Sequence, residues 1–160
     1  MKEKKGEHPF GDAGQVILLV LFLVVWVGDS FFLRWATFPA AYVPLGIRLT
    51  VLGLVLILAL VLIQSSHFII AHDERPDHVV STRAFRYVRH PLYLAALLTY
   101  FGMTASSFSL ISLIVLIGIG FFYNYIASYE EKLLEAKFGE DYRAYQRRTG
   151  KWVPRIGPGS

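Results

Sequence analysis

The sequence contains no cysteine, and charged residues make up only 18% of its 160 positions. The absence of cysteine excludes disulfides, thiolate metal ligands and cysteine nucleophiles. A soluble domain usually carries more charge, about 25% of its residues. The sequence also lacks a glycine-rich phosphate-binding loop and a Ser-His-Asp pattern. Any chemistry must therefore come from other residue types.

Apolar residues, by contrast, make up 54% of the chain and gather in four long stretches. A helix that crosses a bilayer needs about 20 mostly apolar residues. The stretches therefore predict membrane-spanning helices at residues 16–33, 49–70, 91–108 and 110–129. The third is short for a full span, which favours a tilted or partly enclosed helix. The first is too long for the apolar part of a signal peptide, so we expect a retained helix.

The links between these stretches predict how the helices pack. Pro39 and Pro44 break any helix between the first and second stretches. Pro91 suits the first turn of the third helix. The link Thr104-Ala105-Ser106-Ser107 is small and uncharged. It predicts that the third and fourth helices form a tight antiparallel hairpin.

The distribution of Lys and Arg predicts the orientation of the chain in a membrane. Fourteen of the 16 cationic residues lie before the first helix, between the second and third, or after the fourth. Cytoplasmic loops of membrane proteins carry such an excess, so we expect both termini in the cytoplasm. The net charge of +4 fits basic loops that face anionic lipid. We therefore expect membrane lipids, and no nucleic acid, as partners.

The residues after Tyr129 are charged and aromatic, with apolar residues at helical spacing. They predict a helix at residues 131–137, a break at Gly139 and a short helix at 142–148 on the membrane surface. The predicted fold class is all-α: an integral membrane bundle of four transmembrane helices with a cytoplasmic helical tail.

We expect one domain over residues 1–160. Residues 1–78 hold the first two helices and their loops, and residues 79–155 hold the catalytic region.

This topology brings two polar segments together. Residues 86–93 (Arg-Tyr-Val-Arg-His-Pro-Leu-Tyr) begin the third helix, and Glu130-Glu131 lies at the neighbouring end of the fourth. Carboxylates bind ammonium or hydroxyl groups, arginine binds carboxylates, and aromatic rings can face a cationic sulfonium. The segments therefore predict a site for a zwitterionic cofactor. The simpler interpretation is a positive-inside anchor with interface tyrosines and a solvated Glu-Glu-Lys helix.

Other polar residues are weaker candidates. Three histidines and three acidic residues fall within residues 67–78, but their spacing matches no standard metal site, so we expect no metal. Asp29 lies in an apolar helix, where a charged residue is functional by default. Its place near the outer end favours exposure at the interface instead.

Four blocks in the second half of the chain are informative together. They are Arg89-His90-Pro91-Leu92-Tyr93, Glu130-Glu131-Lys132-Leu133-Leu134, Phe138-Gly139-Glu140-Asp141-Tyr142-Arg143-Ala144-Tyr145 and Trp152-Val153-Pro154. In this order and spacing they resemble the isoprenylcysteine carboxyl methyltransferase family, and related phospholipid N-methyltransferases share the Arg-His-Pro and Glu-Glu elements. The resemblance covers about residues 79–155.

The resemblance implies an integral membrane methyltransferase that uses S-adenosylmethionine at the cytoplasmic side and takes a lipophilic acceptor from the bilayer. In this resemblance His90, Tyr93 and Glu130 match cofactor-binding positions, and Glu131 and the tail arginine Arg143 match a region near the reacting centre. From the converging polar segment we add Tyr87 and Pro91 as cofactor-binding residues and Arg89 at the reacting centre.

Two positions depart from the family pattern. Arg83-Ala84-Phe85 stands where Gly-Pro-Tyr is common, which bears on the path of the loop near the cofactor, and Ala95 stands where a glycine is frequent.

Two acceptor chemistries are compatible with these residues. A carboxylate on a prenylated or lipid-like substrate, which we favour, is already nucleophilic and needs only an arginine to orient it. An amine or thiol must lose a proton, and Glu131 is then the candidate base. The alternatives to methyl transfer are an NADPH-dependent reductase of the steroid 5-alpha-reductase type and a non-enzymatic membrane scaffold. The Glu-Glu pair followed by Phe-Gly-x-x-Tyr argues against the reductase.

Overall fold

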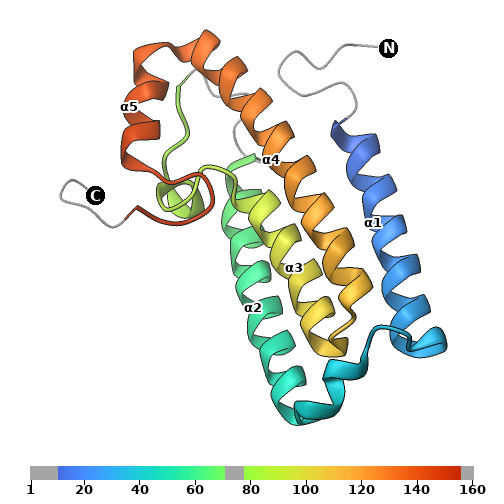
Figure 1. Cartoon of the computed structure of the whole chain (residues 1–160). Coiled ribbons are helices and arrows are strands. Elements are labelled where there is room, and N and C mark those ends of the chain that lie inside the picture. Colours follow the sequence, from blue (N-terminus) through green and yellow to red (C-terminus); the bar gives the residue numbers. More distant parts are fainter. Residues whose placement is uncertain (1–10, 71–77, 156–160) are drawn as a thin grey trace.

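The computed structural model describes residues 11–70 and 78–155, and this part of the chain is all-helical (Figure 1). The α-helices are α1 (Gly11–Val27), α2 (Leu45–Ile70), α3 (Pro91–Ser107), α4 (Leu110–Phe138) and α5 (Glu140–Arg148). Shorter helical turns join them: the π-helical η1 (Gly28–Leu33) and the 3-10 turns η2 (Phe38–Tyr42) and η3 (Arg83–Arg86).

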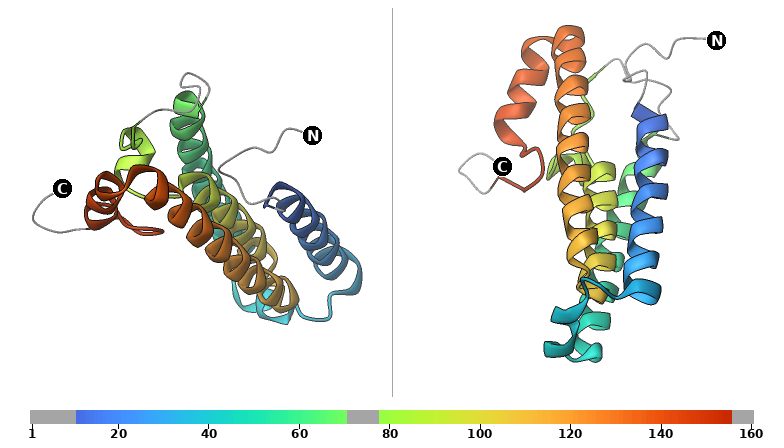
Figure 2. Two further views of the ribbon diagram at one scale, coloured as in Figure 1. Left: turned by 90° about the horizontal axis from the view of Figure 1, so that it is seen from above. Right: turned by 45° about the vertical axis from the view of Figure 1, so that its right-hand side comes forward.

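Helices α1 to α4 lie side by side, and α4 extends beyond the others at the end where α3 begins (Figure 1, Figure 2). Helix α5 turns back along this extension (Figure 1). Where α1, α3 and α4 meet, a small core buries Phe22, Tyr100, Ile119 and Tyr123. We call the end with the start of α3, the α4 extension and α5 the polar end. The opposite end, with the α3–α4 turn, is the hairpin end.

The four predicted apolar helices are confirmed, with bounds shifted by a few residues. The tight α3–α4 turn is also confirmed: Phe108 ends α3 in the left-handed conformation, and the Ser109 side chain caps α4 by accepting from the N–H of Ser112 (3.1 Å). The fourth helix is longer than predicted. It continues through residues 130–138 because nothing in that run breaks a helix, and it stops at Gly139 (φ +55°), as expected.

The expectation for Asp29 was wrong, because this residue is buried, with 2% of its surface exposed. Its carboxylate accepts hydrogen bonds from the N–H of Ala36 (3.1 Å) and the hydroxyl of Ser109 (2.5 Å). The N–H of Leu110 in turn donates to the Ala36 carbonyl at 3.0 Å. The chain after α1 thus folds over the α3–α4 turn, and Asp29 ties the two together.

Three described helical segments are long and apolar enough to cross a membrane: Ala13–Leu33, Leu45–Ser66 and Leu110–Phe138. Their outward faces expose large apolar side chains such as Val24, Leu54 and Ile114, a distribution that suits lipid. Helix α3, with 17 residues, is shorter than these segments and packs against α2 and α4. This finding supports three of the four predicted spans and leaves the span at α3 a prediction.

Several predictions fall outside the described residues. These concern the basic residues 2–5, both chain termini, and His72, Asp73, Glu74 and Asp77 of the loop at 71–77. Within residues 11–70 and 78–155, no group of three His, Asp or Glu side chains is arranged to hold a metal ion.

Candidate functional site

The candidate site lies at the polar end, where three parts of the chain meet. Residues 88–93 lead into α3, residues 124–131 belong to α4, and residues 149–152 follow α5. Because α3 and α4 are joined by a tight turn and run in opposite directions, the start of α3 lies beside the later part of α4 (Figure 1). The hairpin thus brings together the two polar segments that the sequence analysis singled out.

A mostly buried ion-pair network forms the centre of the site. Glu131 Oε1 accepts hydrogen bonds from Arg89 Nε (2.8 Å) and His90 Nε2 (3.0 Å), and the Arg89 and Glu131 side chains are only 11% and 13% exposed. The Arg89 guanidinium also donates to the carbonyl oxygens of Gln146 (3.2 Å) and Thr149 (2.6 Å). Buried charges need such partners, because an unpaired one is strongly destabilising. Arg89 therefore joins the start of α3 to α4 and to the end of α5.

The second carboxylate, Glu130, lies among aromatic rings. It accepts a short hydrogen bond from the Tyr93 hydroxyl and lies 3.7 Å from His90 Nδ1. The Tyr93 ring is nearly parallel to that of His90, with centroids 5.7 Å apart, and it also packs against Tyr123. The centroid of the Trp152 ring lies 5.8 Å from the centroid of the His90 ring. A carboxylate with aromatic neighbours is suited to a cationic group.

The chain after α5 packs against this network through a tight turn. The N–H of Arg89 donates to the carbonyl oxygen of Gly150 at 2.9 Å, which pairs the two segments. Position 150 requires glycine, because a Cβ atom there would overlap with the backbone carbonyl of Val153. The turn directs the next two residues back to α4.

Those two residues, Lys151 and Trp152, are fastened to α4 through Asn124. Lys151 Nζ donates to Asn124 Oδ1 (2.9 Å) and Ser128 Oγ (2.7 Å), and Trp152 Nε1 donates to Asn124 Oδ1 (3.3 Å). Burial lowers the pKa of Lys151, and the charge of Glu131 opposes this effect. The sequence analysis missed Asn124, Ser128 and Lys151. The available signal was an asparagine inside an otherwise apolar helix.

The structure brings together six of the eight predicted site residues: Arg89, His90, Pro91, Tyr93, Glu130 and Glu131. Pro91 is the buried first residue of α3. Tyr87 is exposed and lines a neighbouring pocket. Arg143 lies apart, since its Nε binds Glu135 at 2.7 Å and its Nη1 lies 3.8 Å from Glu140, all on exposed side chains.

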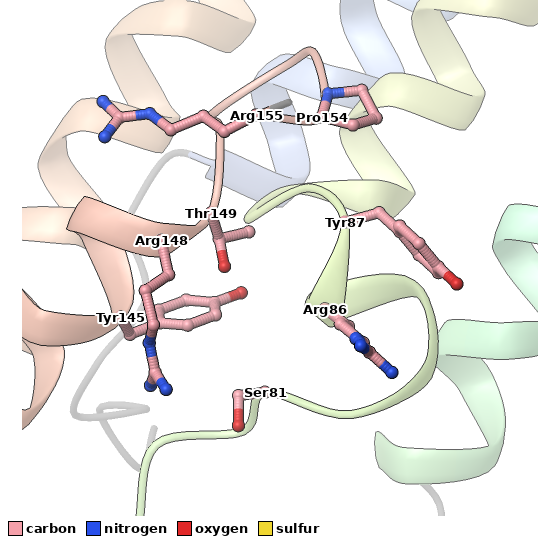
Figure 3. A pocket seen from close by; sticks show the side chains of 8 residues that line it. All are labelled: Ser81, Arg86, Tyr87, Tyr145, Arg148, Thr149, Pro154 and Arg155. Atoms are coloured by element: carbon pink, nitrogen blue, oxygen red, sulfur yellow. The ribbon is translucent and has the colours of Figure 1, made fainter. Parts of the chain in front are cut away.

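The neighbouring pocket is a cavity of about 380 Å³ that we call the arginine pocket, because Arg86 and Arg148 line it (Figure 3). Thr149 and Tyr145 also contribute to its wall. Burial raises the pKa of Tyr145, so its hydroxyl stays protonated, and it donates to the carbonyl of Phe85 at 2.6 Å. This hydrogen bond joins η3 to α5. No acidic residue of the described chain lines the pocket.

The fold and the site together define a class of protein: a helical membrane protein with a charged, aromatic-lined site at one end of its bundle. A family model of phospholipid methyltransferases matches residues 41–141, well over half of the chain. The chain belongs to the phospholipid methyltransferase family. No individual curated protein matches it.

Family membership confirms the sequence-based resemblance at the level of the superfamily, to which the isoprenylcysteine carboxyl methyltransferase-like proteins also belong. The matched residues include the Arg89–Tyr93 and Glu130-Glu131 blocks, but not α1 or the segment after α5. Family membership and the three apolar helices together make this protein an integral membrane methyltransferase that acts on lipids.

Proposed function

We propose that the protein transfers a methyl group from S-adenosylmethionine to a lipid at the membrane–water boundary. The observation that carries this proposal is the meeting of the Arg89–Tyr93 block with Glu130-Glu131 within hydrogen-bond distance, in a member of the phospholipid methyltransferase family. At the polar end of an apolar bundle, a polar cofactor can arrive from water and a lipid from the bilayer.

The residues present fit this cofactor by their chemistry. S-adenosylmethionine carries a sulfonium, an ammonium and a carboxylate, and it supplies an electrophilic methyl group when bound. The Glu130 carboxylate and the rings of Tyr93, His90 and Trp152 offer a negative charge and aromatic faces to its cationic groups. In this proposal Tyr87 and Pro91 complete the cofactor side. Methyl transfer then depends mainly on alignment of the reactants and exclusion of water.

The network assigns different tasks to the residues expected at the reacting centre. Arg89 is a positioning residue, because its guanidinium already binds Glu131 and two backbone carbonyls. Among the described residues, both arginines expected there, Arg89 and Arg143, are bound to glutamates, which favours an amine-bearing lipid over a carboxylate acceptor. Glu131 engages Arg89 and His90 through Oε1, so Oε2 is the atom that would accept the proton that an amine must lose. The same two hydrogen bonds stabilise the charged carboxylate and make it a weaker base.

We also propose that α3 is a fourth span and that the polar end is cytoplasmic. The support is the packing of α3 between α2 and α4 and the 14-to-2 division of Lys and Arg. Reporter fusions at residues 1 and 160 should both report the cytoplasm. Termini on opposite sides of the membrane would contradict the four-span topology.

Calorimetric titration of the detergent-purified protein tests the cofactor. We expect S-adenosylmethionine and its demethylated product to bind, and NADPH not to bind. Glu130→Ala should weaken cofactor binding about tenfold or more, because a hydrogen bond to a charged group contributes roughly 1.5–3 kcal/mol. Glu135→Ala, on the same helix but at the surface, is the matched control.

Each alternative function predicts a different titration. Binding of NADPH in place of S-adenosylmethionine would favour the reductase, and binding of neither would favour the scaffold. An unchanged affinity in a folded Glu130→Ala protein would remove Glu130 from the cofactor site.

A further inference from the structure

A cavity of about 670 Å³ lies at the hairpin end, between α1, α2 and α3. We call it the leucine crevice, because one side of it is formed by four leucines of α2: Leu45, Leu49, Leu52 and Leu56. The indole N–H of Trp26 donates to the carbonyl oxygen of Met103 at 2.8 Å and so joins α1 to α3 where both line the crevice. Helix α1 lies outside the residues that match the family model. The crevice is therefore a feature of this chain beyond the matched region.

The leucine side of the crevice has the length of a lipid acyl chain. The four leucines are three or four residues apart and therefore lie on one face of α2. Between Leu45 and Leu56 the helix rises by about 16 Å, at 1.5 Å per residue. This is about half of the 30 Å thickness of the hydrocarbon core of a bilayer. An acyl chain from a single leaflet can therefore lie along this face.

The end of the crevice nearest the α3–α4 turn is polar. Arg34 directly follows η1, and Arg48 lies in the first turn of α2. Arg48 Nη1 donates to the carbonyl oxygen of Ser106 at 3.0 Å. Its Nε and the hydroxyl of Ser30, which also lines the crevice, are buried and have no hydrogen-bond partner among the described residues. The crevice thus has an apolar side and a polar end, as a lipid does.

The charge at this polar end is positive and uncompensated. Neither Arg34 nor Arg48 forms an ion pair within residues 11–70 and 78–155, and no acidic residue of these ranges lines the crevice. Asp29 belongs to the same end, but it is buried and accepts hydrogen bonds from Ala36 and Ser109. An anionic group would compensate the two guanidinium charges. A headgroup that also carries an ammonium would find no carboxylate for it.

Exposed aromatic side chains place this end of the bundle at a membrane–water boundary. Trp35 is 75% exposed and Tyr42 is 84% exposed. Both residue types are typical of the headgroup level of a bilayer. Arg34, the neighbour of Trp35, therefore lies at the level of lipid phosphates. A soluble anion could contact the arginines but would leave the leucine side uncovered, which favours a lipid.

We propose that the leucine crevice binds one anionic membrane lipid, whose phosphate contacts Arg34 and Arg48 and one of whose acyl chains lies along residues 45–56 of α2. This lipid is distinct from the methyl acceptor. Helix α3, with 17 residues and a length of about 25 Å, separates the crevice mouth at Ser106 from the network around His90. The bound lipid would fill the space between α1 and α2 and hold α1 against the bundle. The proposal does not depend on the proposed function.

Trp26 can report occupancy, because it lines the crevice. The sequence has three tryptophans, so Trp35→Phe/Trp152→Phe leaves Trp26 as the only one. The full chain with both substitutions is reconstituted in phosphatidylcholine vesicles. An increasing fraction of the lipid is replaced by phosphatidylglycerol or phosphatidylcholine with brominated acyl chains, since bromine quenches the fluorescence of a nearby tryptophan. We expect half-maximal quenching at about a tenfold lower fraction of the brominated phosphatidylglycerol.

Substitutions of the two arginines test the headgroup contact. Arg34→Gln and Arg48→Gln should each reduce the preference for phosphatidylglycerol by about threefold to tenfold. Arg34→Gln is the cleaner test, because Arg34 is exposed, whereas Arg48→Gln also removes the hydrogen bond to Ser106. Arg86→Gln removes the same charge at the polar end and is the control, which should keep the full preference. Circular dichroism and thermal melting establish that each variant is folded.

Three results would overturn the lipid site: equal quenching by the two brominated lipids, an unchanged preference in a folded Arg34→Gln/Arg48→Gln double variant, and a loss of preference in Arg86→Gln. Two competition results would overturn the assignment of its ligand. Glycerophosphate that displaces the brominated lipid as effectively as phosphatidylglycerol would assign the arginines to a soluble phosphate compound. A fatty acid that displaces it equally well would assign them to a carboxylate. No step uses S-adenosylmethionine, so failure of the proposed function would leave these results unaffected.

Discussion

The two ends of the bundle each enclose a carboxylate, but the groups that hold it differ. At the hairpin end, Asp29 accepts hydrogen bonds from an amide N–H and a hydroxyl, both neutral groups that belong to turns. At the polar end, Glu131 is bound by a guanidinium and an imidazole. Neutral donors from turns fix the path of the backbone. A guanidinium and an imidazole beside a second carboxylate, aromatic rings and a basic cavity can also take part in binding.

The comparison shows that a buried acidic residue in an apolar helix does not by itself mark a functional site. Both Asp29 oxygens accept hydrogen bonds from within the fold, from Ala36 and Ser109, and the residue is buried. Glu131 forms both of its hydrogen bonds through one oxygen, and Glu130 lies one residue away. What distinguishes Glu131 from Asp29 is the set of polar groups around it.

The largest effect is expected when the polar-end ion pair loses one partner. Arg89→Met leaves Glu131 enclosed without its guanidinium, and breaking a buried pair in this way costs about 3–5 kcal/mol. We therefore expect a large drop in the melting temperature of the detergent-solubilised protein. Arg89→Met/Glu131→Leu should recover part of the loss, because both charges are then gone. A single variant as stable as the wild type would mean that the network does not support the fold.

At the hairpin end we expect a smaller loss of stability and no loss of cofactor binding. Asp29→Ala removes the acceptor of two hydrogen bonds and should lower the free energy of unfolding by about 2 kcal/mol. Thermal melting gives the stability, and calorimetric titration with S-adenosylmethionine gives the affinity. Weaker cofactor binding in a folded Asp29→Ala protein would contradict the division between a structural end and a cofactor-binding end.

Most of the helical fold could be predicted from the sequence, because apolar runs long enough to cross a bilayer leave few alternatives. The convergence of His90 with Glu131 followed from the hairpin, which the small, uncharged link already indicated. The burial of Asp29 could not be predicted, because its partner Ser109 is 80 residues away in the chain. Its role depends on how the loop after α1 packs onto the α3–α4 turn, which no local pattern encodes.

The assignment of arginines was the least predictable part of the site. Arg89 and Arg143 each belong to one of the family-like sequence blocks. The sequence therefore does not show which of the two lies at the site. In the structure Arg89 binds Glu131, whereas Arg143 binds Glu135, which lies about one helical turn further along α4. Arg143 belongs to α5, so the carboxylate that it reaches on α4 depends on the turn between α4 and α5 at Gly139, whose φ is positive. Arg89 reaches Glu131 instead through the packing of the start of α3 against α4.

The smallest expected effect concerns backbone strain, which also differs between the two ends. At the hairpin end, the left-handed residues Arg34 and Phe108 each terminate a helix. At the polar end, Arg83 opens η3 with φ of +51°, at the position where the related family commonly has glycine. The left-handed conformation costs a residue other than glycine roughly 1–2 kcal/mol. The loop therefore keeps a conformation that glycine favours, although it carries arginine.

Replacing Arg83 by glycine and by alanine separates this strain from the contacts of the arginine side chain, because both variants lack that side chain. We expect Arg83→Gly to be more stable than Arg83→Ala by about 0.5–1 kcal/mol, since relief of strain exceeds the entropic cost of glycine. Ala84→Gly is the control: its φ is not positive, so glycine there should destabilise. Melting temperatures of the three proteins in one detergent decide the matter. If Arg83→Gly melts below Arg83→Ala, the polar end holds its loop without strain, and the departure from the family glycine has no stability cost.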